Sequence, residues 1–132
     1  MSIVETKAVV SRFFEALRQG DVGRLADLIA DDATWWVAPT YRFSGTYDKP
    51  QMVAILTHLF AASAGPYDAR IVELTAEDDR VSATAVARLE LKDGTLYQND
   101  YHALFRVTNG RITACKEFFD SYRAGLAFGF PD

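Results

Sequence analysis

The sequence predicts an α+β fold in which three N-terminal helices pack on one face of a bent, mostly antiparallel sheet. Apolar residues recur at helical spacing through roughly the first 60 residues. From about residue 68 the period changes to two, which is typical of strands with one buried face. Two hairpin-type dipeptides, Asp93-Gly94 and Asn109-Gly110, divide this second part. Helices followed by consecutive antiparallel strands indicate an α+β layout.

The first two helices are predicted from apolar faces and end signals. The first covers about residues 4–19 and ends near Gly20. Asp21 is suited to cap a short second helix, which the segment from Ala30 to Ala33 interrupts. The apolar face of the first helix consists of Val9, Val10, Phe13, Phe14 and Leu17.

A short strand and a third helix follow. Residues 34–37 are typical of a strand, and 39–45 are expected to form a loop. Asp48, with Gln51 three residues later, indicates the start of a third helix, which Gly65-Pro66 ends.

The remaining chain predicts four long strands, the first over residues 68–76. On the third, Tyr97, Asn99, Tyr101, Ala103 and Phe105 share one face by alternation. On the fourth, strict alternation places Ile112, Ala114, Lys116, Phe118 and Asp120 together. An acid at the end of a largely apolar strand face is costly unless it is used or paired. Asp120 is therefore the candidate catalytic residue.

Composition bounds the protein class. A chain of 132 residues is expected to be one domain with its own core. The net charge of −4 offers no basic stripe for nucleic acid. One cysteine excludes an internal disulfide and favours a reducing compartment. We see neither a signal peptide nor a membrane-spanning run, and expect a cytoplasmic protein.

Short motifs spread over residues 8–122 resemble one known family. The motifs are Arg12-Phe-Phe-Glu-Ala-Leu17, Gly20-Asp21, Ala30-Asp-Asp-Ala-Thr34, Phe43-Ser-Gly45, Gly110-Arg-Ile112 and Glu117-Phe-Phe-Asp120. In order and spacing they resemble the SnoaL-like, ketosteroid-isomerase-related group with the nuclear transport factor two-like fold. The resemblance implies a cone whose helices close one end of a strongly curved sheet, leaving a pocket at the other. This fold hosts several chemistries as well as non-enzymes.

The resemblance also implies candidate mechanisms. Ketosteroid isomerases place a base Asp on the first strand, where this chain has Trp35-Trp36-Val37. Enzymes that resemble limonene-epoxide hydrolase need an Arg-x-Asp pair on the penultimate strand as well as an Asp on the last strand. At the place of that pair this chain has Asn99 and Tyr101. SnoaL-like cyclases rely on one acid at the end of the last strand, which Asp120 matches. The resemblance therefore favours a cofactor-free cyclase or isomerase acting on a hydrophobic carbonyl compound.

In this hypothesis Asp120 removes a proton next to a carbonyl, and Asn99 and Tyr101 donate hydrogen bonds to the enolate oxygen. The alternative for Asp120 is a strand-end acid that caps a turn or pairs with Arg123. The alternative for Asn99 and Tyr101 is ordinary packing on the strand face. A non-catalytic ligand-binding or assembly domain and an epoxide-hydrolase-like hydrolase also stay open. The expected substrate contacts are Trp36, Phe14, Tyr97, Phe105, Phe118 and Tyr41.

Partners are predicted as follows. We expect a hydrophobic small-molecule ligand, no metal and no cofactor, since His58 and His102 stand apart in the sequence. We expect no nucleic acid and no membrane. Relatives often pair sheet to sheet, so the resemblance favours a homodimer. The apolar tail after Asp120 is expected to cover the pocket mouth or the partner subunit.

Overall fold

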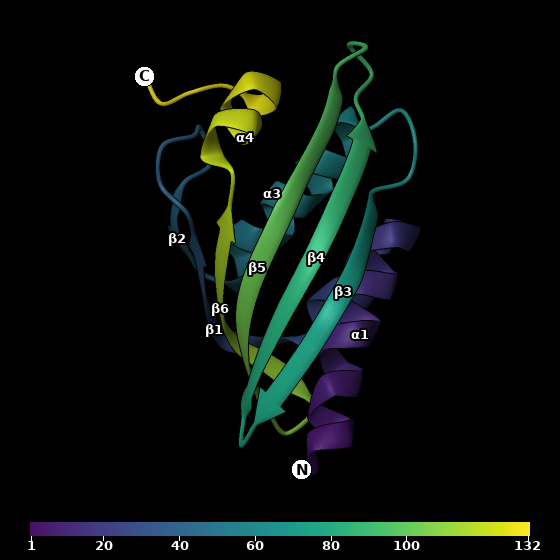
Figure 1. Ribbon diagram of the computed structural model, residues 1–132, viewed down its shortest axis with the longest axis vertical. Coiled ribbons are helices and arrows are strands. Elements are labelled where there is room, and N and C mark those ends of the chain that lie inside the picture. Colours follow the sequence, from purple (N-terminus) through teal and green to yellow (C-terminus); the bar gives the residue numbers. More distant parts are fainter.

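The computed structural model describes all residues 1–132, and four helices pack against one mixed sheet in an α+β arrangement. Figure 1 shows α1 and α3 behind the long strands, and α4 at the end of the molecule opposite the N-terminus. The helices are α1 (Ile3–Gln19), α2 (Val22–Leu28), α3 (Lys49–Ala62) and α4 (Ser121–Phe128). None of them combines the length and the apolar character that crossing a bilayer requires.

The sheet has six strands in the order β2-β1-β6-β5-β4-β3. All neighbouring pairs are antiparallel except β1 and β6, which run parallel. The strands are β1 (Ile29–Val37), β2 (Gly45–Tyr47), β3 (Asp68–Glu77), β4 (Arg80–Glu90), β5 (Leu96–Thr108) and β6 (Arg111–Phe119). The four predicted long strands are confirmed. The first short strand, expected over residues 34–37, begins earlier, at Ile29. The strand β2 was not predicted, and it begins at Gly45, where the expected loop ends.

Local capping explains where the helices begin. The Asp48 carboxylate accepts from the Gln51 backbone at 2.9 Å, and the Gln51 side chain accepts from the Asp48 backbone at 2.9 Å. This reciprocal pair confirms the predicted start of α3. Gly20 ends α1 in the left-handed region, with φ of 64°.

The core lies between the helices and the concave face of the sheet. Alanines line β4 where α1 crosses it: Ala83, Ala85 and Ala87 are all buried. Their small side chains let the helix approach the sheet closely. The predicted inward face of β5 is confirmed, because Tyr97, Asn99, Ala103 and Phe105 are buried and Tyr101 is half-buried.

The predicted inward face of β6 was wrong beyond its first residues. The pairing of β5 with β6 shifts register between Arg106 and Val107, so that Thr113 has no partner opposite it. Such a bulge inverts the alternation of every later side chain. The inward residues are therefore Ile112, Cys115, Glu117 and Phe119, whereas Lys116 and Phe118 are exposed.

Candidate functional site

Glu117 is the acid that the bulge in β6 turns toward the interior. Its cross-strand partner on β5 is Ala103, whose methyl group leaves space in front of the carboxylate. The indole N–H of Trp35 on β1 donates a hydrogen bond to Glu117 Oε1 at 2.9 Å. Trp35 is 1% exposed, and its position is fixed by packing against Phe13 and Phe105, with ring centroids 5.3 and 6.0 Å away. The carboxylate is thus held in one place.

A cavity of about 390 Å³ opens in front of this carboxylate. Its 21 lining residues include 16 hydrophobic ones, contributed by α1, β1, α3, β5, α4 and the connecting loops. Among the charged lining residues Glu117 alone is half-buried, whereas Arg42, Lys92 and Asp93 are exposed. A mostly apolar cavity of this size with few polar groups is typical of a small-molecule site.

Burial controls the titration of the site. It raises the pKa of Glu117 from 4.5 to about 6, and the Trp35 hydrogen bond opposes that shift. Four tyrosines also line the cavity: Tyr41, Tyr67, Tyr97 and Tyr101. Burial, together with the Glu117 charge, raises the pKa of Tyr97 to about 12 and that of the other three well above 10. All four phenols therefore keep their protons at neutral pH and can act as donors.

Hydrogen bonds orient the phenols around Tyr101. The Asn99 amide donates to the Tyr97 hydroxyl at 2.9 Å, and the Tyr97 hydroxyl contacts that of Tyr101. The Tyr67 hydroxyl donates to that of Tyr101 at 3.4 Å. Either hydroxyl can be the donor in the Tyr97–Tyr101 contact. In the arrangement in which Tyr97 donates, the Tyr101 oxygen accepts from both Tyr97 and Tyr67, and the Tyr101 proton is free to donate into the cavity.

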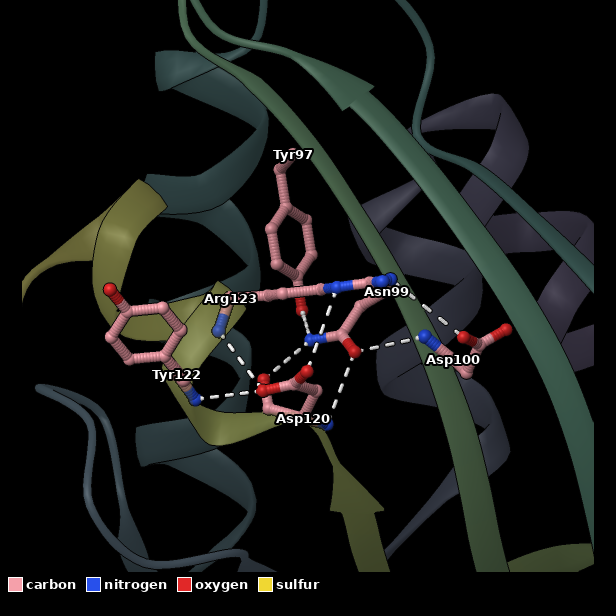
Figure 2. A network of polar contacts seen from close by, with 6 residues as sticks. All are labelled: Tyr97, Asn99, Asp100, Asp120, Tyr122 and Arg123. Carbon is pink, nitrogen blue, oxygen red and sulfur yellow. Dashed lines mark hydrogen bonds and ion pairs between the residues drawn. The ribbon is translucent and has the colours of Figure 1, made fainter.

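Asn99 itself has no group left for a ligand. Its Oδ1 accepts from the backbone N–H of Asp100 at 2.9 Å and of Asp120 at 3.1 Å. Its amide group donates to the Asp120 carbonyl and to the Tyr97 hydroxyl, each at 2.9 Å. Figure 2 shows this side chain between Tyr97 and the start of α4. The geometry gives Asn99 a clamping function, in place of the expected oxyanion contact.

Asp120 is placed differently from the sequence-based expectation. Its carboxylate caps α4, accepting from the backbone N–H groups of Tyr122 at 3.0 Å and Arg123 at 3.2 Å (Figure 2). It also pairs with the Arg123 guanidinium at 3.6 Å, and 49% of the side chain is exposed. Asp120 does not line the cavity. This is the capping arrangement that the sequence left open as the alternative.

Trp36 is placed differently from the sequence-based expectation. Trp36 was predicted to line the pocket, but Trp35 has the inward position. Trp36 lies on the outer face of the sheet, with its ring centroid 5.0 Å from that of Phe118 and the Lys116 ammonium 5.9 Å from its ring. Phe118 is 48% exposed, so neither Trp36 nor Phe118 is a cavity residue. The reason lies in the bulges, since β1 also shifts register against β6 between Ile29 and Thr34.

The other predicted contacts divide into two groups. Tyr41, Tyr97 and Tyr101 line the cavity as expected. Phe14 and Phe105 instead form the aromatic layer behind Phe13, with Phe14 and Phe105 centroids 6.3 Å apart. The apolar tail forms α4, whose Ala127 and Phe128 cover part of the cavity.

Among the cavity residues that sequence reasoning missed are two that place polar groups there, Glu117 and Tyr67. Glu117 alternates with Cys115 and Phe119, a period-two pattern that competes equally with the one that favoured Asp120. Tyr67 lies between α3 and β3, just after Gly65-Pro66, where no periodic pattern assigns a face. No three His, Cys, Asp or Glu side chains come close enough together to hold a metal ion.

Comparisons with known proteins concern the family and the fold. The family model described as SnoaL-like domain matches residues 10–115, from α1 into β6. No protein of curated function matches the sequence.

Solved structures share the fold. An NTF2-like protein from Burkholderia xenovorans is 22% identical, with a TM-score of 0.75 over 96% of this chain and 98% of that one. PrhC from Penicillium brasilianum is 13% identical, with a TM-score of 0.82 over 92% of this chain and 84% of that one. TerC, crystallised with polyporic acid, is 17% identical, with a TM-score of 0.79 over 92% of this chain and 96% of that one. At these identities the likeness is one of fold.

Proposed function

Since the chain belongs to the SnoaL-like domain family, we propose that it is a cofactor-free enzyme that removes a proton next to the carbonyl of a hydrophobic compound. Cyclisation of the aldol type and isomerisation both begin with this step. The observation that carries the proposal is the enclosed carboxylate of Glu117 facing an apolar cavity. Glu117 replaces Asp120 as the base, because Asp120 lies outside that cavity.

The titration of Glu117 suits a general base. With a pKa of about 6 the carboxylate is mostly ionised at neutral pH, yet it accepts a proton more readily than an ordinary glutamate. Its Trp35 hydrogen bond fixes one carboxylate oxygen and leaves the other to face the substrate. A positioned base of this kind contributes about 10²–10⁴-fold to a rate.

Tyr101 supplies the complementary group. Proton abstraction places negative charge on the carbonyl oxygen, and a donor aimed at that oxygen stabilises the enolate. The Tyr101 hydroxyl is such a donor when Tyr97 and Tyr67 both donate to its oxygen, and those two bonds then polarise its proton further. Tyr101 lies two residues from Ala103, the cross-strand partner of Glu117, so base and donor border the same part of the cavity.

The cavity lining defines the substrate class. Sixteen of its 21 residues are hydrophobic, which favours an apolar body with few polar atoms. Among proteins of this fold, TerC was crystallised with polyporic acid.

Exchange of the protons next to a carbonyl tests the proposal without a known substrate. We expect the chain to accelerate deuterium uptake by 2-tetralone in D₂O, followed by NMR, and Glu117→Gln to lower that rate about 10²–10⁴-fold. Asp120→Asn is the matched control, because asparagine also caps a helix well. Binding without accelerated exchange would support the non-catalytic alternative. Loss of exchange in Asp120→Asn alone would return the base to Asp120.

A further inference from the structure

Charged side chains border the mouth of the cavity, where its lining is exposed to solvent. Four exposed lining side chains there are charged or titratable: Arg42, His58, Lys92 and Asp93. They come from the loop after β1, from α3 and from the turn between β4 and β5. The loop and the turn lie in the half of the molecule away from the N-terminus, and α3 lies behind the long strands (Figure 1). Two permanent positive charges, from Arg42 and Lys92, and one carboxylate, from Asp93, therefore border the opening in a chain whose net charge is −4.

No acid of the protein pairs with these two cations. Seven ion pairs link charged side chains elsewhere, and none includes Arg42 or Lys92. The guanidinium of Arg42 lies 5.5 Å from the centroid of the Phe43 ring, a contact that positions it without neutralising its charge. Asp93 is held within its own turn, where its carboxylate accepts from the Thr95 backbone at 2.9 Å.

The charge of Glu117 favours one orientation of a charged ligand in the cavity. An anionic group beside the ionised Glu117 would be repelled strongly, because charges interact more in an enclosed apolar site than in water. The same anionic group at the mouth would meet Arg42 and Lys92. Only one orientation of a singly charged ligand therefore avoids repulsion and gains attraction.

We propose that the ligand of this cavity is an amphipathic keto acid, whose apolar body fills the cavity and whose carboxylate lies at the mouth against Arg42 and Lys92. The inference rests on the proposed function, since it concerns the same cavity. It adds a substrate class with a defined orientation, in which the ketone lies toward Glu117 and Tyr101.

Two probes of similar shape separate the charge from the apolar body. These are 2-acetylnaphthalene, which is neutral, and 6-acetyl-2-naphthoate, which adds a carboxylate at the far end. Titration calorimetry of the intact chain at pH 8 and low salt should give the naphthoate about tenfold tighter binding, the size expected of two exposed ion pairs. This preference should shrink as salt is added, because exposed charges are screened.

Substitutions test whether the preference for the naphthoate depends on Arg42 and Lys92. In Arg42→Gln/Lys92→Gln the two probes should bind with equal affinity. Lys116→Gln removes an exposed cation on the outer face of the sheet and should leave both dissociation constants unchanged. Equal affinities for the intact chain, or a preference that survives the double substitution, would overturn the inference while the proposed function stands. Binding of neither probe would overturn both.

Discussion

The indole N–H of Trp35 donates to the carboxylate of Glu117 across the parallel pair β1 and β6, with 2.9 Å between Nε1 and Oε1. Burial raises the pKa of this carboxyl group and the Trp35 bond lowers it, and the result is about 6. Two adjacent strands thereby place the base and set its strength. Most of the consequences that can be measured follow from this pair.

The first prediction concerns stability. Because the folded-state pKa of Glu117 lies above its unfolded value of 4.5, its contribution to stability is fully present below pH 4.5 and is lost as the pH rises through about 6. The loss amounts to about 2 kcal/mol by pH 8. Glu117→Gln removes this loss and keeps an acceptor for Trp35. Urea unfolding should therefore find the variant about 2 kcal/mol more stable than the parent chain at pH 8 and nearly equal to it at pH 4.

Glu77→Gln, which neutralises an exposed acid at the end of β3, is the control and should show no such pH-dependent gain. A stability difference for Glu117→Gln that is the same at both pH values would contradict the raised pKa.

A second prediction separates the two tryptophans. Trp35→Phe removes the donor that favours the ionised form of Glu117, so the pKa of Glu117 should rise. The midpoint of the pH profile for 2-tetralone exchange should move above 6, provided that circular dichroism shows the variant to be folded. Trp36→Phe changes the same residue type on the outer face and should leave the midpoint in place. An unchanged midpoint in Trp35→Phe would show that the bond does not tune the base.

A third prediction concerns the clamp between β5 and α4. Asn99→Ala removes four hydrogen bonds, one to the Tyr97 hydroxyl, one to the Asp100 backbone and two to the Asp120 backbone. The free energy of unfolding should fall by about 2–4 kcal/mol. Gln98→Ala, at the exposed neighbouring position, should change it by less than about 0.5 kcal/mol. A loss of under 1 kcal/mol in Asn99→Ala would mean that water replaces the clamp.

The homodimer expected from the family resemblance yields a fourth prediction. Phe118, Leu104 and Trp36 lie on the outer face of the sheet, and the first two are 48% and 41% exposed. Sedimentation velocity should find the intact chain as a dimer and Phe118→Asp as a folded monomer. Thr108→Asp, at an exposed position near the far end of β5, is the control and should stay dimeric. A monomeric parent chain would contradict the expectation.

Most of the fold was predictable because its determinants are local. Asp48 with Gln51, Gly20, and the two turns at Gly94 and Gly110 each impose a start, an end or a reversal through their own backbone preferences. The inward face of β5 was predictable for a similar reason, since its alternation runs unbroken from Tyr97 to Phe105.

The site was harder to predict because it depends on bulges. The unpaired Thr113 in β6 moves Glu117 inward, and Asp120 beyond the strand end becomes a helix cap. A bulge depends on how a strand pairs with its neighbours, and the residue types of Thr113 and Ala114 do not predict one at this position. One extra residue in the ladder therefore transferred the proposed base from Asp120 to Glu117.

The pKa of Glu117 is the quantity on which the account depends most. A carbon-detected NMR titration of the side-chain carboxyl groups measures it in the intact chain, and the resonance that is missing in Glu117→Gln gives the assignment. We predict a midpoint of about 6 for Glu117, above the ordinary value of 4.5. A midpoint at or below 4.5 would show a carboxylate that water or an ion pair already stabilises, and would contradict its assignment as the base.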